Sequence, residues 1–483
     1  MQPAIRNFLL LFAGCLLFHL AGTWTLPLID RDEPRFAEAS REMIERNDYV
    51  VPYFNNRYRF DKPPLTYWFQ TVSYRILGEN DFAARLPSAI AAALTALLLL
   101  AWGRRLDDER IGWWAAIMFT LCFQTFLHGK AAVADMWLVL FVTAAHWAGY
   151  ELLRDRFRDQ PAAALQRRWW WLFYLSLAFA FLAKGPIGWT PLLAIASTKF
   201  FLPEVKLNRR FLFFTGLLLT VSIVAAWGIP ALVRTNGEFF RVGIGRHVVG
   251  RSFGAMEGHG GKSFGSYLLW LPFYFLTIFL TFAPWAFSLP RLMRRLWRRR
   301  DPLDSYLLSA AAVIFIAFTF VQTKLPHYTL PAFPLLALLL AKWFATQPNA
   351  ARHVRRTAIA AGCVALLIVA ATPFLARFFV GRELMLQAKS DLTPQMQFGG
   401  TRYKDPSLVW YFRRHVKGWM ADLDDDAVKL FMETPGARFV ILPTASATDL
   451  YPSLPQGWKT FSVRGFNTSS GKRLELTLLL KPS

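Results

Sequence analysis

Charged residues are scarce in this sequence. They make up 18% of the 483 residues, whereas 54% of the residues are hydrophobic and 44 are phenylalanine. A water-soluble fold of this length has no interior large enough for so much apolar surface. The sequence therefore predicts a polytopic membrane protein.

Cysteine is also rare, and acidic residues are outnumbered. The three cysteines, Cys15, Cys122 and Cys363, all lie inside apolar runs, which excludes a disulfide scaffold and a cysteine-based zinc site. The 32 acidic residues against 55 basic ones give a formal net charge of +23, which taken alone would suggest nucleic acid as a partner. The position of that charge along the chain decides the question.

Apolar runs long enough to cross a hydrocarbon core of about 30 Å recur along the chain. We expect an all-α membrane module with eleven spans, or up to thirteen if the short pieces around Lys184 and Lys324 hide more. The first run resembles a signal peptide but has no clear cleavage site, so we expect it to be retained. The expected spans lie near 8–29, 84–102, 111–127, 131–152, 169–183, 186–202, 211–233, 267–289, 305–322, 325–343 and 358–380.

Basic residues gather in loops on one side of this alternating trace. By the positive-inside rule that side is cytoplasmic, so much of the charge excess reflects topology and attraction to anionic lipids. A nucleic-acid partner is not expected. We expect a multi-pass membrane protein whose basic loops lie in the cytoplasm. The basic loops lie near 104–110, 154–168, 199–210, 291–300 and 342–356.

The opposite, periplasmic side holds the larger loops and the end of the chain. Residues 1–380 are expected to form the membrane module, with a first periplasmic loop over 30–83 and a flexible one over 234–266. Residues 381–483 change character: an acidic run at 422–426 is followed by strand-like segments at 437–443 and 472–481. We expect them to form a small α/β domain.

The first periplasmic loop begins with two acids and a proline. Pro34 suits the first turn of a helix, so Glu33 is expected at the cap and Asp32 just before it. Arg31 and Arg35 would keep Asp32 ionised. The alternative is that both acids merely cap a helix that lies in the membrane interface. The apolar stripe of that helix would be Phe36, Ala39, Ser40, Met43 and Ile44.

A second acid–base pair follows in the same loop. Asp61 and Lys62 stand between Tyr58 and the pair Pro63–Pro64, and two prolines fix the direction of the backbone. Such a fixed carboxylate and ammonium are suited to point at one ligand. Glu33 and Tyr58, which flank the two pairs, are weaker candidates for substrate binding. The alternative is an ordinary surface pair in a proline-rich turn.

The motifs DEPRFAEASREM, FDKPPLTYW and ARLPSAIAA resemble those of polyprenyl-phosphate-dependent glycosyltransferases of the GT-C type. The resemblance is closest to bacterial 4-amino-4-deoxy-L-arabinose transferases of lipid A and to their protein O-mannosyltransferase relatives. It implies that Asp32 is catalytic and that Arg35, Asp61 and Lys62 surround a lipid-linked phosphate or a bound metal. The lipid A enzymes usually have Glu at the position of Asp61 and Ile at that of Pro64.

Two further charges lie at the periplasmic ends of spans. Asp135 begins a span, where an unpaired carboxylate is costly, and the resemblance also implies a catalytic acid here. Lys130 is close enough in sequence to pair with it. Lys184 stands between two apolar runs and is a weaker candidate for substrate contact. The alternatives are an acid favoured by the helix dipole and a lysine that snorkels.

The loop over 241–259 is rich in glycine and basic residues. Guanidinium groups match phosphate oxygens, so the loop is suited to cover a phosphate. The resemblance supports Arg246, His247 and Arg251 for that contact, and the alternative is a solvated loop.

One more motif has the form K-L-P-x-Y-x-L-P. It contains Lys324, His327 and Tyr328 at the periplasmic start of a span. The resemblance implies that Lys324 and Tyr328 contact the donor phosphate and that His327 is a weaker candidate for substrate contact. The alternative is a proline-bounded helix start with interfacial anchors.

All these candidates fall on the face opposite the basic loops. The resemblance implies a glycosyltransferase of a bacterial inner membrane that moves a sugar from undecaprenyl phosphate to a periplasmic acceptor, in the first place lipid A. A divalent metal ion held by Asp61 and Asp135 would assist the departing phosphate. Asp32 would act as a base toward a hydroxyl acceptor, or orient an acceptor that is already a phosphate.

Two alternatives to lipid A transfer stay open. One is transfer to protein or to polysaccharide. The other is a lipid or sugar transporter, which would carry ionisable residues near mid-membrane and internal repeats. Neither transporter feature is evident in the sequence.

Overall fold

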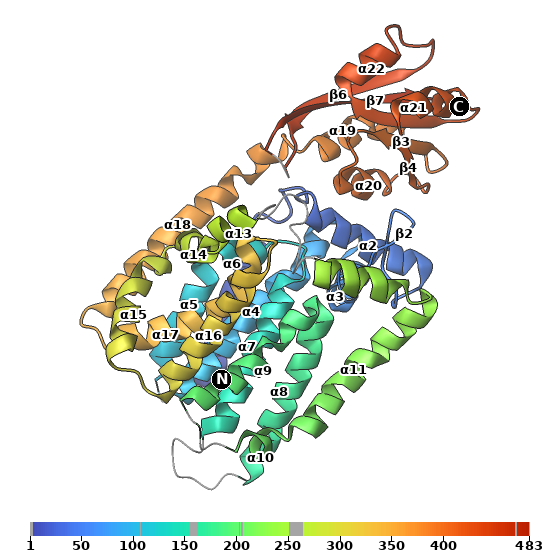
Figure 1. Cartoon of the computed structure of the whole chain (residues 1–483). Coiled ribbons are helices and arrows are strands. Elements are labelled where there is room, and N and C mark those ends of the chain that lie inside the picture. Colours follow the sequence, from blue (N-terminus) through green and yellow to red (C-terminus); the bar gives the residue numbers. More distant parts are fainter. Residues whose placement is uncertain are drawn as a thin grey trace.

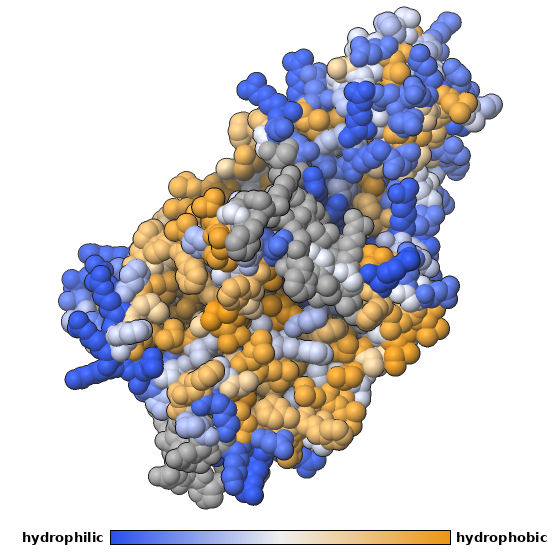
Figure 2. Space-filling view, viewed as in Figure 1, coloured by the Kyte–Doolittle hydropathy of each residue, from blue (hydrophilic) through white to orange (hydrophobic). Residues whose placement is uncertain are grey.

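The computed structural model consists of a helical body and a C-terminal domain that lies on one end of it (Figure 1). It describes residues 3–106, 108–154, 163–201, 203, 206–250, 264–468 and 471–482. We call the end of the body that carries the C-terminal domain the capped face. On the surface in view, much of the body is apolar and the C-terminal domain is largely hydrophilic (Figure 2).

Six helical segments in the described ranges are long and apolar enough to cross a membrane. Each coincides with a predicted span, so the prediction of a multi-pass helical membrane protein is confirmed. The segments are α4 (Asp81–Arg105), α7 (Asp135–Arg154), α11 (Phe213–Arg234), α16 (Pro302–Phe320), η6 (Pro326–Ala332) with α17 (Phe333–Ala345), and α18 (Ala350–Ala376).

Among the other predicted spans, the helix over Ala163–Lys184 has 22 residues but is not one of these six segments, and the rest are shorter or broken helices. The run predicted as 267–289 is bent by 113° between Tyr267–Thr281 and Trp285–Arg298. Pro284 stands at this bend, where a proline cannot donate to the preceding turn. The remaining segments are α1 (Pro3–Leu20), α5 (Glu109–Leu121), α6 (Phe123–His128), α8 (Ala163–Lys184), η2 (Pro186–Trp189), α9 (Thr190–Ser197), η3 (Thr198–Phe200), α10 (Leu207–Phe211), η4 (Phe240–Gly250), α13 (Phe264–Trp270), α14 (Phe273–Thr281), η5 (Trp285–Ser288) and α15 (Leu289–Arg298).

Breaks in the helices bring polar residues to the capped face. Helix α5 breaks from α6 at Cys122, and α8 breaks from η2 at Gly185. Gly185 has a φ of 79°, in the left-handed region that a residue with a Cβ rarely adopts. The turn therefore ends α8 immediately after Lys184 and leaves that side chain near the capped face.

The first loop contains α2 (Asp32–Arg46), the hairpin of β1 (Tyr53–Phe54) and β2 (Arg57–Tyr58), and α3 (Leu65–Leu77). The predicted apolar stripe of α2 is mostly buried, as expected. However, Glu38, Arg41 and Glu42 on its polar side are buried as well. The C-terminal domain covers them, so α2 is an internal helix between the two parts of the molecule.

The C-terminal domain is built on a mixed five-stranded sheet of order β4-β3-β5-β7-β6. Strand β3 pairs in parallel with β4 and β5, and β7 pairs antiparallel with β5 and β6. The strand-like segments at 437–443 and 472–481 form β5 and β7. The strands and helices of the domain are α19 (Val380–Ala388), η7 (Lys389–Asp391), β3 (Gln397–Thr401), α20 (Pro406–Phe412), β4 (Met420–Leu423), α21 (Asp425–Glu433), β5 (Arg438–Pro443), α22 (Thr444–Leu450), β6 (Lys459–Phe466) and β7 (Arg473–Lys481).

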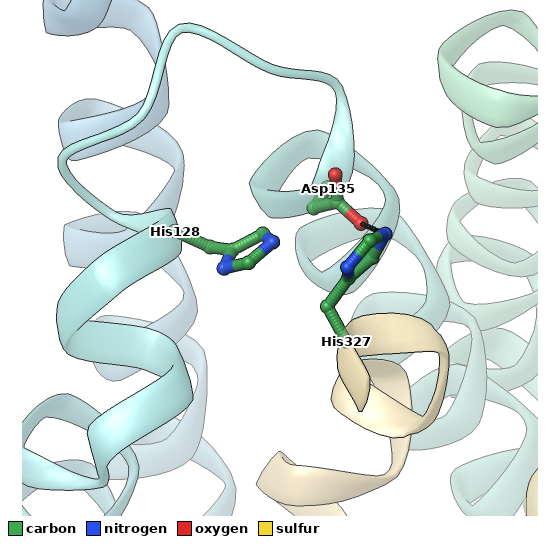
Figure 3. A group of neighbouring side chains, drawn as sticks. All are labelled: His128, Asp135 and His327. Atoms are coloured by element: carbon green, nitrogen blue, oxygen red, sulfur yellow. Dashed lines mark ion pairs between the residues drawn. The ribbon is translucent and has the colours of Figure 1, made fainter. Parts of the chain in front are cut away.

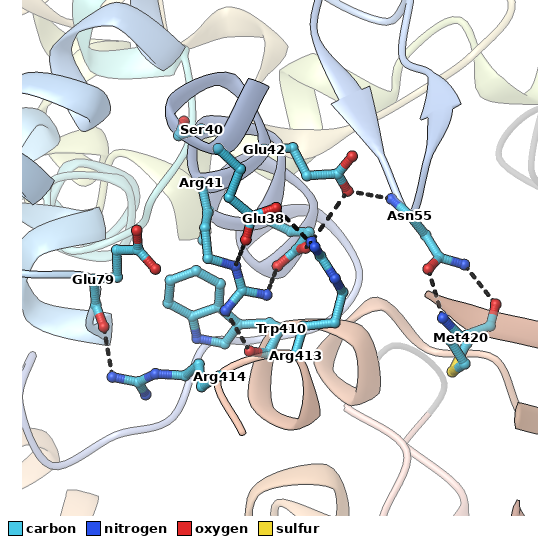
Figure 4. A network of polar contacts seen from close by, with 12 residues as sticks. Glu38, Ser40, Arg41, Glu42, Asn55, Glu79, Trp410, Arg413, Arg414 and Met420 are labelled. Atoms are coloured by element: carbon cyan, nitrogen blue, oxygen red, sulfur yellow. Dashed lines mark hydrogen bonds and ion pairs between the residues drawn. The ribbon is translucent and has the colours of Figure 1, made fainter. Parts of the chain in front are cut away.

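A polar network joins the first loop to the C-terminal domain (Figure 4). The guanidinium of Arg413 forms ion pairs with Glu38 and, at 2.7 Å, with Glu45. On the other side of the network, Asn55 donates to the carbonyl oxygen of Met420 at 2.8 Å and accepts from its N–H at 2.9 Å. The first loop and the C-terminal domain therefore pack as one unit on the body.

Candidate functional site

A cavity of about 580 Å³ lies at the capped face of the helical body. Its wall combines apolar side chains with ionisable ones from the first loop, the α6–α7 connection, the end of α8 and η6. The ionisable members are Asp32, Arg35, Arg59, Asp61, Lys62, His128, Asp135, Lys184, His327 and Tyr328. Eight of these are residues that the sequence analysis proposed, drawn from four separate segments.

Asp32 is the first residue of α2 and is exposed at the cavity. It stands inside the helix, because the cap position is taken by Arg31, two residues before the expected cap Glu33. In the described part of the chain, no hydrogen bond or ion pair is recorded for its carboxylate. The group is therefore available to a molecule in the cavity.

Asp61 and Lys62 line the cavity beside an arginine that the sequence analysis did not single out. Asp61 forms an ion pair with the guanidinium of Arg59 at 3.2 Å, and the Lys62 ammonium donates to the carbonyl oxygen of Asp61 at 3.0 Å. Arg59 also donates to the hydroxyl of Tyr67 at 3.0 Å. Arg59 could have been predicted from its position two residues before Asp61, because alternate residues of an extended segment lie on the same face.

Asp135 pairs with Lys184 across the cavity wall. The Lys184 ammonium lies 2.5 Å from Asp135 Oδ1, and it also lies over the ring of Tyr328, 5.5 Å from the ring centroid. The suggested partner Lys130 is wrong: its ammonium instead donates to the carbonyl oxygens of Phe18 and, at 2.8 Å, Ala21. Lys130 thus closes the end of α1, because that helix end has carbonyl groups without partners.

Two histidines approach the same carboxylate (Figure 3). Nε2 of His327 lies 4.0 Å from Asp135 Oδ1, and one potential ligand atom each of His128, Asp135 and His327 lies within 4.8 Å of the other two. The sequence analysis placed a metal between Asp61 and Asp135. In the described residues Asp61 is not part of this group, and the residues best arranged to hold an ion are these three.

Glu33 does not line the cavity, contrary to its proposed role in substrate binding. Its carboxylate is buried and paired with Arg85, 2.7 Å from Nη2, and it accepts from the N–H groups of Ile29 at 2.8 Å and Ala132 at 2.7 Å. Arg85 donates in addition to the carbonyl oxygen of Pro27 at 2.8 Å. Glu33 therefore fixes the path of the chain between α1 and α2.

Lys324 and Tyr58 also lie outside the cavity lining. The Lys324 ammonium is buried and donates to the carbonyl oxygens of Thr319 and, at 3.1 Å, Phe318, so it caps the end of α16. Tyr58 is exposed on β2 and packs against the rings of Tyr53 and Phe60. Neither side chain is in position to contact a molecule in the cavity.

The loop predicted to cover a phosphate is described only in part. Arg246 and His247 belong to the π-helical segment η4, but their side chains are outside the described residues. Arg251 lies outside the described residues altogether. The prediction for these three residues stays a prediction.

Comparison with known proteins places this geometry in context. Residues 61–229 match the family described as dolichyl-phosphate-mannose-protein mannosyltransferase. The chain is 32% identical over 329 residues to the undecaprenyl phosphate-alpha-4-amino-4-deoxy-L-arabinose arabinosyl transferase 2 of Sodalis glossinidius, covering 65% of this chain and 55% of that enzyme. It is 28% identical over 327 residues to an uncharacterized protein of Aquifex aeolicus, covering 67% of this chain and 70% of that one.

The chain thus spans little more than half of the arabinosyl transferase that it matches. The fold has a fuller counterpart among solved structures. ArnT from Cupriavidus metallidurans bound to undecaprenyl phosphate matches with a TM-score of 0.79 and 19% identity, covering 97% of both chains. The archaeal oligosaccharyltransferase AglB from Archaeoglobus fulgidus matches with a TM-score of 0.55 and 13% identity, covering 92% of this chain and 70% of that one. These likenesses confirm the predicted fold.

Proposed function

We propose that this chain, which resembles the GT-C glycosyltransferases in its motifs and fold, transfers a sugar from a polyprenyl phosphate donor at its capped face. The observation that carries the proposal is the cavity itself. It gathers a carboxylate without a partner in the described chain, Asp32, and two ammonium groups, Lys62 and Lys184, at the membrane boundary. Leu193, which also lines the cavity, is 57% exposed on the body surface. A long lipid tail therefore has an apolar route into the site.

The residues of the cavity divide the work of sugar transfer. The bond between the anomeric carbon and the phosphate oxygen breaks, and its electron pair goes to the phosphate. Lys62 and Arg35 stabilise the charge that develops there, because fixed cations in a water-poor site act strongly on developing charge. The acceptor oxygen forms the new bond to the anomeric carbon.

Asp32 acts on the acceptor. If the acceptor is a hydroxyl group, its proton passes to the Asp32 carboxylate, which is exposed at the cavity. If the acceptor is a phosphate, no proton leaves and Asp32 orients it. Asp135 holds the Lys184 ammonium in the cavity, because its Oδ1 lies 2.5 Å from Lys184 Nζ.

The names of the relatives support an undecaprenyl phosphate donor and an aminoarabinose sugar. Lipid A as the acceptor rests on the motif resemblance. The proposal also puts the capped face toward the periplasm of a bacterial inner membrane, because the basic loops of the sequence lie on the opposite side of the expected spans. The mannosyltransferase family match supports the second candidate, transfer to protein.

Mass spectrometry of reaction products tests this proposal. The full chain in lipid nanodiscs is incubated with undecaprenyl phosphate aminoarabinose, or with polyprenyl phosphate mannose, and with lipid A or an acceptor protein. The expected result is lipid A that has gained one aminoarabinose residue. A mannose increment on protein would establish the second candidate, and no increment on any acceptor would contradict both.

A further inference from the structure

Another cavity, of about 540 Å³, lies at the end of the helical body opposite the capped face. Helix α4 runs between the two ends. It begins at Asp81, whose carboxylate accepts hydrogen bonds from Trp410 Nε1 at 2.8 Å and from the Tyr411 hydroxyl at 2.9 Å, both in the C-terminal domain. It ends at Arg105, which lines this cavity. A helix of its 25 residues is about 37 Å long, so the cavity is separate from the candidate functional site.

We call it the basic cavity, because three arginines line it. Arg104 and Arg105 end α4, and Arg168 lies in the first turns of α8. The rest of the wall is largely aromatic and aliphatic, and it includes Phe8 of α1, Trp147 of α7 and Trp169 of α8. The ends of four helices thus assemble a pocket that combines positive charge with apolar surface.

The carboxylates near this wall do not balance its arginines. Nε of Arg105 lies 2.9 Å from Glu151 Oε2, but a second arginine shares that carboxylate at 3.2 Å. Nε of Arg104 lies 3.8 Å from Glu109 Oε2. Within the described ranges, Arg168 has no recorded ion pair. The basic cavity therefore carries positive charge that the protein does not neutralise there.

The ring of Trp169 holds two of these cations. The guanidinium carbon of Arg105 lies 5.3 Å from the ring centroid and that of Arg168 lies 5.0 Å from it. Contact with an aromatic ring fixes the position of a guanidinium group. Two like charges beside one ring repel each other, and an anion in the cavity would offset that repulsion. Trp169 is 7% exposed, and its indole N–H finds no acceptor among the described residues.

We propose that the basic cavity binds the phosphate headgroup of an anionic phospholipid. Guanidinium forks match the oxygens of a phosphate. The three arginines belong to the basic loops, so this face is cytoplasmic, and basic pockets between membrane helices on that side are suited to lipid headgroups. Binding here does not depend on the proposed sugar transfer.

The surface beside the cavity favours a lipid over a soluble phosphate. Leu9 on α1 is 53% exposed and Trp171 on α8 is 41% exposed, close in sequence to Phe8 and Trp169 of the wall. Hydrocarbon covers such apolar side chains in a membrane. A lipid with its phosphate in the cavity therefore has apolar surface along which its acyl chains continue.

A specific site differs from general attraction between basic loops and anionic lipids. General attraction depends on the number of charges, whereas a site depends on which arginine is removed. Arg167 and Arg168 are adjacent on α8 and both are exposed, but only Arg168 lines the cavity. Arg167→Ala is therefore the matched control for Arg168→Ala.

Native mass spectrometry of the full chain tests the proposal. The chain is stripped of lipid in detergent and mixed with equal amounts of phosphatidylglycerol and phosphatidylcholine. We expect one molecule of phosphatidylglycerol per chain, retained in preference to phosphatidylcholine. Arg168→Ala and Arg104→Ala should each lower the affinity for phosphatidylglycerol about 10-fold or more, because each removes hydrogen bonds to a charged group. Arg168→Lys should restore only part of it, since an ammonium lacks the planar fork.

Arg167→Ala should bind phosphatidylglycerol as tightly as the unchanged chain does. Should Arg104→Ala fail to fold, as judged by thermal unfolding, Arg168→Ala decides, because that side chain is exposed. Equal losses in Arg167→Ala and Arg168→Ala, or equal retention of the two lipids, would overturn the proposal. Displacement of the lipid by inorganic phosphate, but not by chloride at the same ionic strength, would assign the cavity to a soluble anion and overturn it too.

Discussion

Arg413 of the C-terminal domain forms an ion pair with Glu38 of α2, the helix that begins at Asp32. Both side chains are buried, with exposed fractions of 3% and 0%. Arg41 binds the same glutamate and donates to the carbonyl oxygen of Trp410 at 3.3 Å. The C-terminal domain therefore holds in place the helix whose first residue lines the cavity.

Arg413→Met is expected to loosen α2. Removal of one partner from a buried ion pair leaves the other charge uncompensated, at a cost of about 3–5 kcal/mol. We expect a lower thermal midpoint, faster hydrogen exchange in α2 and slower sugar transfer. Arg414→Met is the control, because Arg414 is exposed, donates to the carbonyl oxygen of Glu79 at 2.6 Å and lies 5.5 Å from the centroid of the Trp410 ring, without a buried ion pair among the described residues. Equal midpoints and exchange rates in the two variants would contradict this role for Arg413.

The contact between Asp30, just before α2, and the C-terminal domain is expected to depend on pH. Asp30 accepts a hydrogen bond from the N–H of Ser407 at 2.9 Å. Burial raises the pKa of Asp30 to about 7, helped by the charge of Asp405 and opposed by the Ser407 hydrogen bonds and Arg35. Burial and Glu38 likewise raise the pKa of Glu42 to about 7.

Because the pKa values of Asp30 and Glu42 are raised, the folded chain keeps these two carboxyl groups protonated at pH values at which the unfolded chain has lost the protons. The free energy of unfolding should therefore fall as pH rises from about 4 to about 7, and level off above. Thermal unfolding across this range measures the slope. Asp30→Asn should reduce the slope, whereas Asp426→Asn, at an exposed position on α21, should not. A slope that Asp30→Asn leaves unchanged would contradict the assignment.

The helices and strands were predictable because they follow from local pattern. The membrane helices are continuous apolar runs, and β5 and β7 are apolar segments bounded by turn residues. The break of the helix at Cys122, between α5 and α6, could not be predicted from hydropathy, because the residues on both sides of it are apolar.

Partner choice could not be predicted, because it depends on how helices pack. Asp135 lies near Lys130 in sequence, yet it pairs with Lys184, and Lys130 caps α1. His128 was not proposed for the site, since only the fold brings it to His327. The motif resemblance pointed to Asp32 as the catalytic acid, but the adjacent Glu33 was also kept as a candidate for substrate binding, and only the fold shows that Glu33 does not line the cavity.

Glu33→Ala tests whether Glu33 stabilises the fold or binds the substrate. Its carboxylate is buried against Arg85, so Glu33→Ala should cost about 3–5 kcal/mol of stability. The protein that still folds should keep the unchanged KM for the donor, because Glu33 does not line the cavity. Thermal unfolding and steady-state kinetics on the same preparation give both values. A raised KM with an unchanged thermal midpoint would return Glu33 to the binding site.

Lys62→Ala should weaken donor binding. A hydrogen bond to a charged group contributes about 1.5–3 kcal/mol, so the KM for the lipid-linked sugar should rise about 10- to 100-fold. The thermal midpoint should change little, because the Lys62 side chain is partly exposed. Lys417→Ala, at an exposed position in the C-terminal domain, is the control. An unchanged KM for the donor would remove Lys62 from the phosphate site.

Asp32→Asn separates the two kinds of acceptor. The variant keeps the size of the side chain at an exposed position, so the thermal midpoint should match that of the unchanged chain and of Asp426→Asn. With a hydroxyl acceptor, loss of the base should lower kcat about 10²- to 10⁴-fold. With a phosphate acceptor no proton is removed, and the loss should be smaller and independent of pH. Full activity of Asp32→Asn with every acceptor would exclude Asp32 from the chemistry, since an asparagine cannot take a proton.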